Sequence, residues 1–208
     1  MTRFEKGFAM LIEETNVPDA ALPVDALKAH LRLGSGFGQD TVQDGVLAGF
    51  LRAALAAVEA RTGKALMARE FTQSVGELRG AEALNLAVAP VTVIASVTLV
   101  SRDGAEQTVS PDIYWLERDG HTPKLRAAAA CLPGPERGGA LRVRFLAGFG
   151  AEFDDLPADL RQAVLMLAAH YYEYRHDTAL SDGCMPFGVS SLIERFRNLR
   201  IGLSGART

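Results

Sequence analysis

Three residues in the last quarter of the chain have side chains that could catalyse a reaction or bind a metal. His170 and Glu173 are spaced so that a helix would place them one turn apart, and Cys184 follows further along. A metal site would need more ligands from a facing helix, and the other segments with helical spacing offer no His and Glu pair. Cys184 is close to His176 and Asp177 in sequence, but a thiol is activated only when a base or a positive charge lies beside it in space. We therefore predict no catalytic residue and no metal ligand, and keep a small enzyme using His170, Glu173 and Cys184 as the alternative.

Two glycine-containing segments superficially match nucleotide-binding loops. Gly34-x-Gly36-x-Gly38 would need a strand before it, whereas the residues before it have helical spacing. Thr62-Gly63-Lys64-Ala65 lacks the hydroxyl residue after the lysine, and Val58 stands where the first glycine of a phosphate loop belongs. We interpret the first segment as a loop between helices and the second as a helix C-terminus. No cofactor is expected.

Composition restricts the class of protein further. The chain has 208 residues, 48% hydrophobic and 23% charged, which suits one soluble domain or a domain with an insertion. Its net charge of −3 argues against a conventional DNA-binding face. Cys131 and Cys184 have neither metal nor redox spacing, and no apolar run approaches the ~20 residues that span a membrane. We expect a reducing, cytosolic environment and no membrane partner.

Hydrophobic periodicity predicts an α+β fold. Apolar residues recur at helical spacing in four segments, at about 24–31, 40–62, 157–175 and 190–199. Between about 69 and 145 the period changes to two, and Asp103-Gly104 and Asp119-Gly120 predict hairpin turns. We therefore expect a helical core with an antiparallel β insertion at 69–145. The predicted organisation is an N-terminal extension at 1–22, one domain at 23–176 and a C-terminal segment at 177–208.

The C-terminal segment differs in charge from the rest of the chain. Four arginines and one glutamate give residues 186–208 a net charge of +3, which leaves −6 for the remainder. Val189, Leu192, Ile193 and Phe196 form an apolar stripe there. Such a short amphipathic segment needs a surface on which to bury its stripe. That surface is either an acidic partner or the chain's own core.

Several short motifs, in this order and spacing over roughly residues 22–200, resemble the head–tail connector (adaptor) family of tailed phages and gene transfer agents. They are Leu27-Lys28-Ala29-His30-Leu31-Arg32, Val58-Glu59-Ala60-Arg61-Thr62-Gly63-Lys64-Ala65-Leu66, Ala89-Pro90-Val91 leading into Ile94-x-Ser96-Val97, Val143-Arg144-Phe145-x-Ala147-Gly148-Phe149-Gly150, Pro157-x-x-Leu160-Arg161-Gln162-Ala163, and His170-Tyr171-Tyr172-x-Tyr174-Arg175.

The resemblance implies a structural, non-enzymatic virion component. Such a subunit would form a ring, with twelve copies expected, under the portal protein of a particle assembled in the bacterial cytoplasm. The ring would extend the DNA channel without binding DNA specifically, and a tail-side connector or stopper protein would attach to it. Minimal relatives are largely helical, so the strands at 69–145 are expected to be an insertion. An assembly chaperone that does not enter the particle is a further alternative.

The resemblance also implies that the C-terminal segment reaches into the portal. The residues expected to dock there are Pro186, Phe187, Val189, Leu192, Ile193, Arg195, Phe196, Arg197 and Arg200. The competing interpretation is that the stripe folds back on its own subunit.

Overall fold

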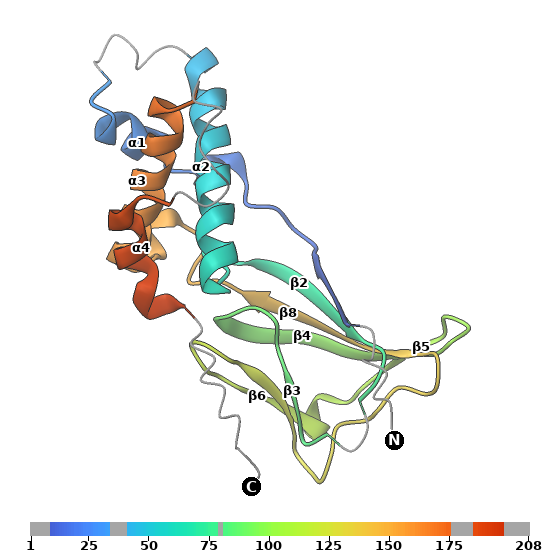
Figure 1. Ribbon diagram of the computed structural model, residues 1–208. Helices are drawn as coiled ribbons and strands as arrows, with labels where there is room; N and C mark the ends of the chain where they lie inside the picture. The colour runs from blue at the N-terminus through green and yellow to red at the C-terminus, as the bar shows by residue number, and fades with distance from the viewer. Residues whose placement is uncertain (1–8, 34–40, 79–80, 176–184, 198–208) are drawn as a thin grey trace, which may run out of the picture.

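A helical bundle stands at one end of two packed β-sheets in the computed structural model, which describes residues 9–33, 41–78, 81–175 and 185–197 (Figure 1). The predicted α+β architecture is confirmed. Within these described ranges, none of the helices has the length and apolar character needed to cross a membrane.

The bundle consists of four α-helices whose positions follow the predicted periodicity. They are α1 (Val24–His30), α2 (Thr41–Thr62), α3 (Ala158–Glu173) and α4 (Phe187–Ile193). Helix α3 packs against the other three, and their buried residues form one hydrophobic cluster with Leu66, Met67, Phe153 and Leu156. Three short 3-10 turns flank the helices or precede them: η1 (Asp19–Ala21), η4 (Phe153–Asp155) and η5 (Glu194–Phe196).

The last helix, predicted at about 190–199, begins and ends somewhat earlier in the chain. Helix α4 begins directly after Pro186, whose φ of −53° suits the position before a helix. At Glu194 the chain tightens into η5, and the extended backbone of Arg197 ends it. The helical stretch therefore lies three residues earlier in the chain at both ends than the pattern of apolar residues indicates.

The larger sheet is fully antiparallel and has the strand order β1-β2-β8-β4-β5. Its strands are β1 (Ala9–Glu13), β2 (Arg69–Val75), β4 (Val91–Val100), β5 (Glu106–Thr108) and β8 (Ala140–Ala147). Alternate residues of β2 and β8, including the stacked rings of Phe71 and Phe145, point toward the second sheet.

The smaller sheet covers the inner face of the larger one. It has the order β3-β7-β6, from β3 (Ala83–Asn85), β6 (Tyr114–Glu117) and β7 (Lys124–Ala127), and η3 (Pro111–Ile113) precedes β6. Leu84, Leu125 and Leu116 lie in register across it and join the second hydrophobic cluster with Phe145. The molecule therefore has two cores, one in the bundle and one between the sheets.

Strand β1 comes from the predicted N-terminal extension. It pairs with β2 at the edge of the larger sheet, with Leu11 opposite Gln73. Its apolar residues Met10, Leu11 and Ile12 are each just over 40% exposed. The β region is thus larger than the predicted 69–145, since it includes residues 9–13 and reaches Ala147. The domain boundaries near residues 22 and 176 stay predictions.

Candidate assembly site

The junction between bundle and sheets begins where α2 ends. The hydroxyl of Thr62 donates to the carbonyl of Val58 at 2.8 Å, and the Gly63 N–H donates to the carbonyl of Glu59 at 2.8 Å. Gly63 has a φ of +67°, a left-handed conformation that glycine adopts at little cost. The helix stops there, as its sequence predicted, and the chain turns toward β2.

The connection from Gly63 to Ala68 lies between two other backbone segments. The Ala65 N–H donates to the carbonyl of Ala89 at 2.8 Å, and the Ala68 N–H donates to the carbonyl of Gly150 at 2.7 Å. Gly148, with a φ of +136°, passes so close that a Cβ there would lie 2.4 Å from the Cα of Ala68. The glycine in the Ala147-Gly148-Phe149-Gly150 motif is therefore required by this close approach.

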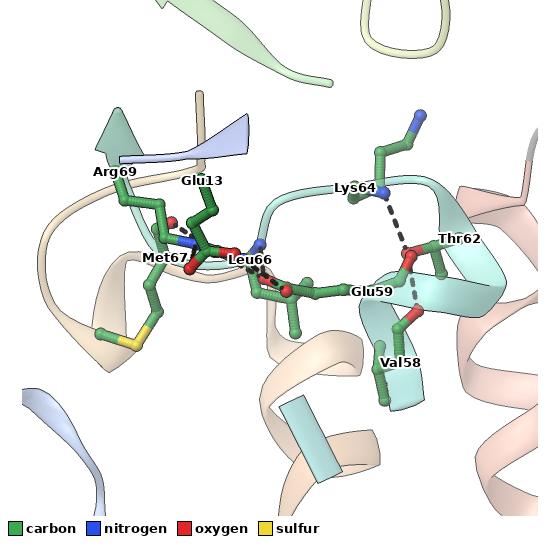
Figure 2. Close-up of polar contacts among 8 residues, drawn as sticks. All are labelled: Glu13, Val58, Glu59, Thr62, Lys64, Leu66, Met67 and Arg69. Atoms are coloured by element: carbon green, nitrogen blue, oxygen red, sulfur yellow. Dashed lines mark hydrogen bonds and ion pairs between the residues drawn. The ribbon is translucent and has the colours of Figure 1, made fainter. Parts of the chain in front are cut away.

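Arg69, the first residue of β2, is the centre of the junction (Figure 2). Its guanidinium donates to both carboxylate oxygens of Glu59, at 2.9 and 2.7 Å, and to both of Glu13, at 2.6 and 3.2 Å. A fifth hydrogen bond, 3.2 Å long, goes to the carbonyl of Met67. All five N–H donors of an arginine are thereby used, and one side chain joins α2, β1 and β2.

Burial of Arg69 makes its pairing important, above all with the less exposed Glu59. Arg69 is only 8% exposed, and burial alone would lower its pKa. Hydrogen bonds to Glu59 and Glu13 outweigh that effect and hold the pKa of Arg69 above its ordinary value. Glu59 also accepts the Leu66 N–H at 2.7 Å, so it orders the connection as well as neutralising the arginine.

The sequence did not lead us to this network. Glu59 and Arg69 each look like ordinary solvated charges, and Glu13 lies in a segment predicted to be an extension. A weak signal exists, because Glu59 is the only acidic residue between Asp44 and Glu70 and it interrupts an alanine-rich helix. Nothing in the sequence pairs it with a particular arginine.

Lys64 is a second buried charge beside the first. It is 2% exposed, and its Nζ lies 3.3 Å from Nδ1 of His121, in the turn between β6 and β7. Burial lowers the pKa of Lys64, and the charge of Asp119 partly opposes this. Figure 2 shows the Lys64 side chain directed away from Glu59 and Arg69. Lys64 therefore links the end of α2 to the smaller sheet rather than serving as a solvated helix end.

The residues predicted to dock on a portal fall into two groups. Val189 and Ile193 are almost fully buried in the bundle core, Leu192 and Phe196 pack at its edge, and Pro186 precedes α4. Their stripe is covered by the subunit itself, as the competing interpretation expected, and a role of these residues at the portal stays a prediction.

The other predicted docking residues are exposed. Phe187 is 88% exposed, Arg195 reaches Asp159 at 3.0 Å, and Arg197 reaches Glu194 at 3.3 Å. Arg200 lies outside the described residues.

The residues with catalytic potential do not come together in the described part of the chain. The His170 ring lies against Tyr174, with ring centroids 4.7 Å apart, and Glu173 is exposed. His176, Cys184 and the Gly34-x-Gly36-x-Gly38 segment lie outside the described residues. Where the structure is described, no three His, Cys, Asp or Glu side chains gather in a way that could hold a metal ion.

Comparison with solved structures finds close relatives. A chain in the neck of an empty gene transfer agent (GTA) particle, computed with C6 symmetry, shares 44% sequence identity, with a TM-score of 0.85 over 95% of this chain and 100% of that one. A chain in the virion of a native GTA particle shares 44% identity, with a TM-score of 0.82 over 92% of this chain and 97% of that one. A chain in the neck of a native GTA particle, computed with C12 symmetry, shares 41% identity, with a TM-score of 0.80 over 95% of this chain and 100% of that one.

No family model matches the chain, and no curated protein matches it significantly. The α+β fold, the structural role of its buried charges and the near full-length likeness to neck chains together define a structural protein of a particle neck. The chain belongs to the head–tail connector (adaptor) family of tailed phages and gene transfer agents.

Proposed function

We propose that this chain is a non-catalytic subunit of the particle neck, forming a ring under the portal. The ring extends the DNA channel and gives the tail its attachment platform. The observation that carries the proposal is the 44% identity, over 95% of this chain, to a chain of a GTA neck. Neck structures computed with C6 and C12 symmetry support a ring of twelve copies.

The proposed partners follow from a place in the neck. The portal protein lies above the ring and a tail-side connector or stopper protein lies below it. Assembly takes place in the bacterial cytoplasm. DNA passes through the channel without specific binding, and the net charge of −6 outside residues 186–208 suits a wall that does not retain phosphates.

For portal docking, the exposed basic side chains are the proposed contacts. Arg195 and Arg197 stand on the surface at the end of the described chain, and Arg200 follows in sequence. Val189 and Ile193 instead hold α4 to α3 and so set the position of these arginines. Residues 187–193, which precede these arginines, are therefore held against the bundle.

Deletion of the gene tests the proposal in particle-producing cells. Heads should fill with DNA but carry no tail, and purified wild-type particles should contain the chain in a fixed ratio to the portal. Normal tails after deletion contradict the proposal. Absence of the chain from purified particles favours the assembly-chaperone alternative, because a chaperone leaves after its work.

Charge reversal tests portal docking separately. Arg195→Glu with Arg197→Glu should abolish association with the portal, while reversal of the exposed loop residues Arg102 and Arg137 should not. Melting temperature should be nearly equal in the two double variants. Equal portal association in both would show that these arginines are not the contact.

A further inference from the structure

Strand β6 forms an open edge of the smaller sheet. Among the described residues it pairs with β7 alone, while β7 lies between β6 and β3. The Ala128 N–H donates to the carbonyl of Ile113 at 2.9 Å, and hydrogen-bonded pairs alternate with other pairs along an antiparallel ladder. The backbone N–H and C=O groups of Tyr114 and Leu116 therefore point away from β7, toward the open edge.

The side chains along this edge are only partly covered. Tyr114 and Leu116 pack against the core between the sheets, yet both remain half-buried. On the other face of β6, Trp115 is 49% exposed and Glu117 forms an ion pair with Arg126. A strand added here therefore needs apolar residues on one face and polar or small residues on the other, at a spacing of two.

The sequence has this pattern just after the last described residue. Three apolar residues alternate with polar or small ones in the order Leu199-Arg200-Ile201-Gly202-Leu203-Ser204. Alternation with a period of two is typical of a strand with one buried face.

The described chain ends next to the open edge. The rings of Phe196 and Phe149 contact edge to face, with their centroids 6.3 Å apart. The neighbouring Gly148 donates its N–H to the carbonyl of Pro90 at 2.9 Å, so Arg197 follows η5 beside the segment that leads into β4. Figure 1 shows the described chain ending, in red, at the end of the bundle nearest the sheets.

A groove of about 460 Å³ lies between this point and β6. One wall consists of residues 90–92, and the other consists of residues 118–120, which directly follow β6. The Arg118 guanidinium donates to the carbonyl of Thr92 at 3.1 Å and so ties the end of β6 to the start of β4. A chain that continues from Arg197 through this groove meets the C-terminal end of β6 first, and it therefore runs antiparallel to that strand.

We propose that, in the free subunit, residues 199–203 of the same chain form a fourth strand of the smaller sheet, along β6. This segment is the occupant that the observations favour, because it starts where the groove begins and carries the alternation that the edge requires. The contact lies within one subunit, so it goes beyond the proposed ring and does not depend on it.

One register matches the residues on both faces of the added strand. It aligns four pairs, namely Arg200 with Glu117, Ile201 with Leu116, Gly202 with Trp115 and Leu203 with Tyr114. Both apolar pairs then face the core, and the charged pair joins opposite signs on the outer face. Trp115 has a glycine opposite it, over which its exposed ring can lie.

Disulfide formation in the purified subunit tests the contact. Cys131 and Cys184 are replaced by serine, and Glu117→Cys is then combined with Arg200→Cys. In the proposed register this pair has no mutual hydrogen bonds, so its Cβ atoms are close. Mild oxidation should therefore give a monomer without free thiols.

The matched control combines Arg200→Cys with Asn85→Cys, on the strand at the opposite edge of the same sheet. That variant should keep both thiols. Two free thiols in the Glu117→Cys variant as well overturn the proposal. A covalent dimer in place of the closed monomer also overturns it, because the edge would then be filled by another copy.

Hydrogen exchange gives a second test that needs no cysteine. The amides of Tyr114 and Leu116 should exchange roughly tenfold more slowly in the wild-type subunit than in an Ile201→Asp variant, which places a charge in the core-facing row. Amides of β8 should be equally protected in both chains, which shows that the variant is folded. Equal exchange at Tyr114 and Leu116 in the two chains overturns the added strand. These measurements use the free subunit, so either result leaves the proposed neck function standing.

Discussion

Arg69 and Glu59 form a two-point ion pair, in which the guanidinium donates to the two carboxylate oxygens at 2.9 and 2.7 Å. The pair holds the start of β2 against the last turns of α2. Glu13 of β1 forms a second ion pair with the same guanidinium. The start of β2 is therefore held by side chains from α2, which directly precedes it, and from β1, which lies more than fifty residues earlier.

The first prediction follows from this pair. Glu59→Ala should destabilise the subunit by about 3 kcal/mol, because it leaves a buried arginine short of one counter-charge and orphans the Leu66 N–H. Glu13→Ala should cost less than about 1 kcal/mol, since Glu13 is 39% exposed and its pair with Arg69 is partly screened. Urea unfolding of the purified subunit measures both. Equal costs would mean that Glu59 has no special role.

Lys64 gives a dependence of stability on pH. Because burial lowers the pKa of Lys64 in the folded state, the unfolded chain binds that proton more tightly. The free energy of unfolding should therefore rise as pH increases from the lowered pKa of folded Lys64 to the ordinary value of 10.5. Below this pH range Lys64 is charged in both states, and its burial destabilises the folded state fully.

Comparison of two variants isolates that effect. Lys64→Met should show a weaker rise in unfolding free energy over this alkaline range than the wild-type subunit, and Lys124→Met, which removes a half-buried lysine, should follow the wild type. Identical pH profiles for Lys64→Met and the wild type would contradict the assignment.

Helix α4 should behave as part of the core. Ile193→Ala should lower the unfolding free energy by about 2–5 kcal/mol, because Ile193 is 2% exposed and its truncation leaves a cavity. Phe187→Ala should leave it unchanged, since that ring touches water. Thermal melting of the two variants distinguishes them, and a stable Ile193→Ala subunit would mean that α4 packs elsewhere.

Two glycines should respond to alanine in opposite directions. Gly45→Ala should stabilise the isolated subunit by roughly 0.5–1 kcal/mol, because the position is helical and open. Gly148→Ala should destabilise it, since its backbone has a positive φ and the new methyl group would strike Ala68. A lower melting temperature for Gly45→Ala would reveal a contact of that position within the subunit.

The purified subunit should bind duplex DNA weakly or not at all at physiological salt. Its net charge is −3, and tight binding to phosphates requires several uncompensated basic side chains. Fluorescence anisotropy with a labelled duplex, repeated at two salt concentrations, is the measurement. Submicromolar affinity that weakens with salt would rule out a non-adhesive channel wall.

Local signals were sufficient for most of the fold. The apolar spacing from Leu47 to Val58 defined α2 to within a residue of its start, and the alternation from Leu141 to Phe145 marked β8. Both patterns depend only on the neighbours of each residue and on one buried face.

Long-range relationships were beyond such reasoning. Met10, Leu11 and Ile12 form an unbroken apolar run without alternation, so nothing marks them as a strand before they pair with β2. The stripe containing Val189 and Ile193 showed that one face is buried but not against which surface. Whether the stripe packs on its own subunit or on another protein could be decided only from the position of α3, against which α4 lies.

Among the described residues, β1 pairs with β2 alone, so its other edge is open, and this limits how long unassembled subunits can accumulate without aggregating. Natural edge strands are commonly guarded by lysine, proline or a bulge, and none of these occurs in Ala9–Glu13. Its exposed apolar residues make a free subunit a template for intermolecular sheet growth. Subunits made in surplus are therefore expected to aggregate through this edge.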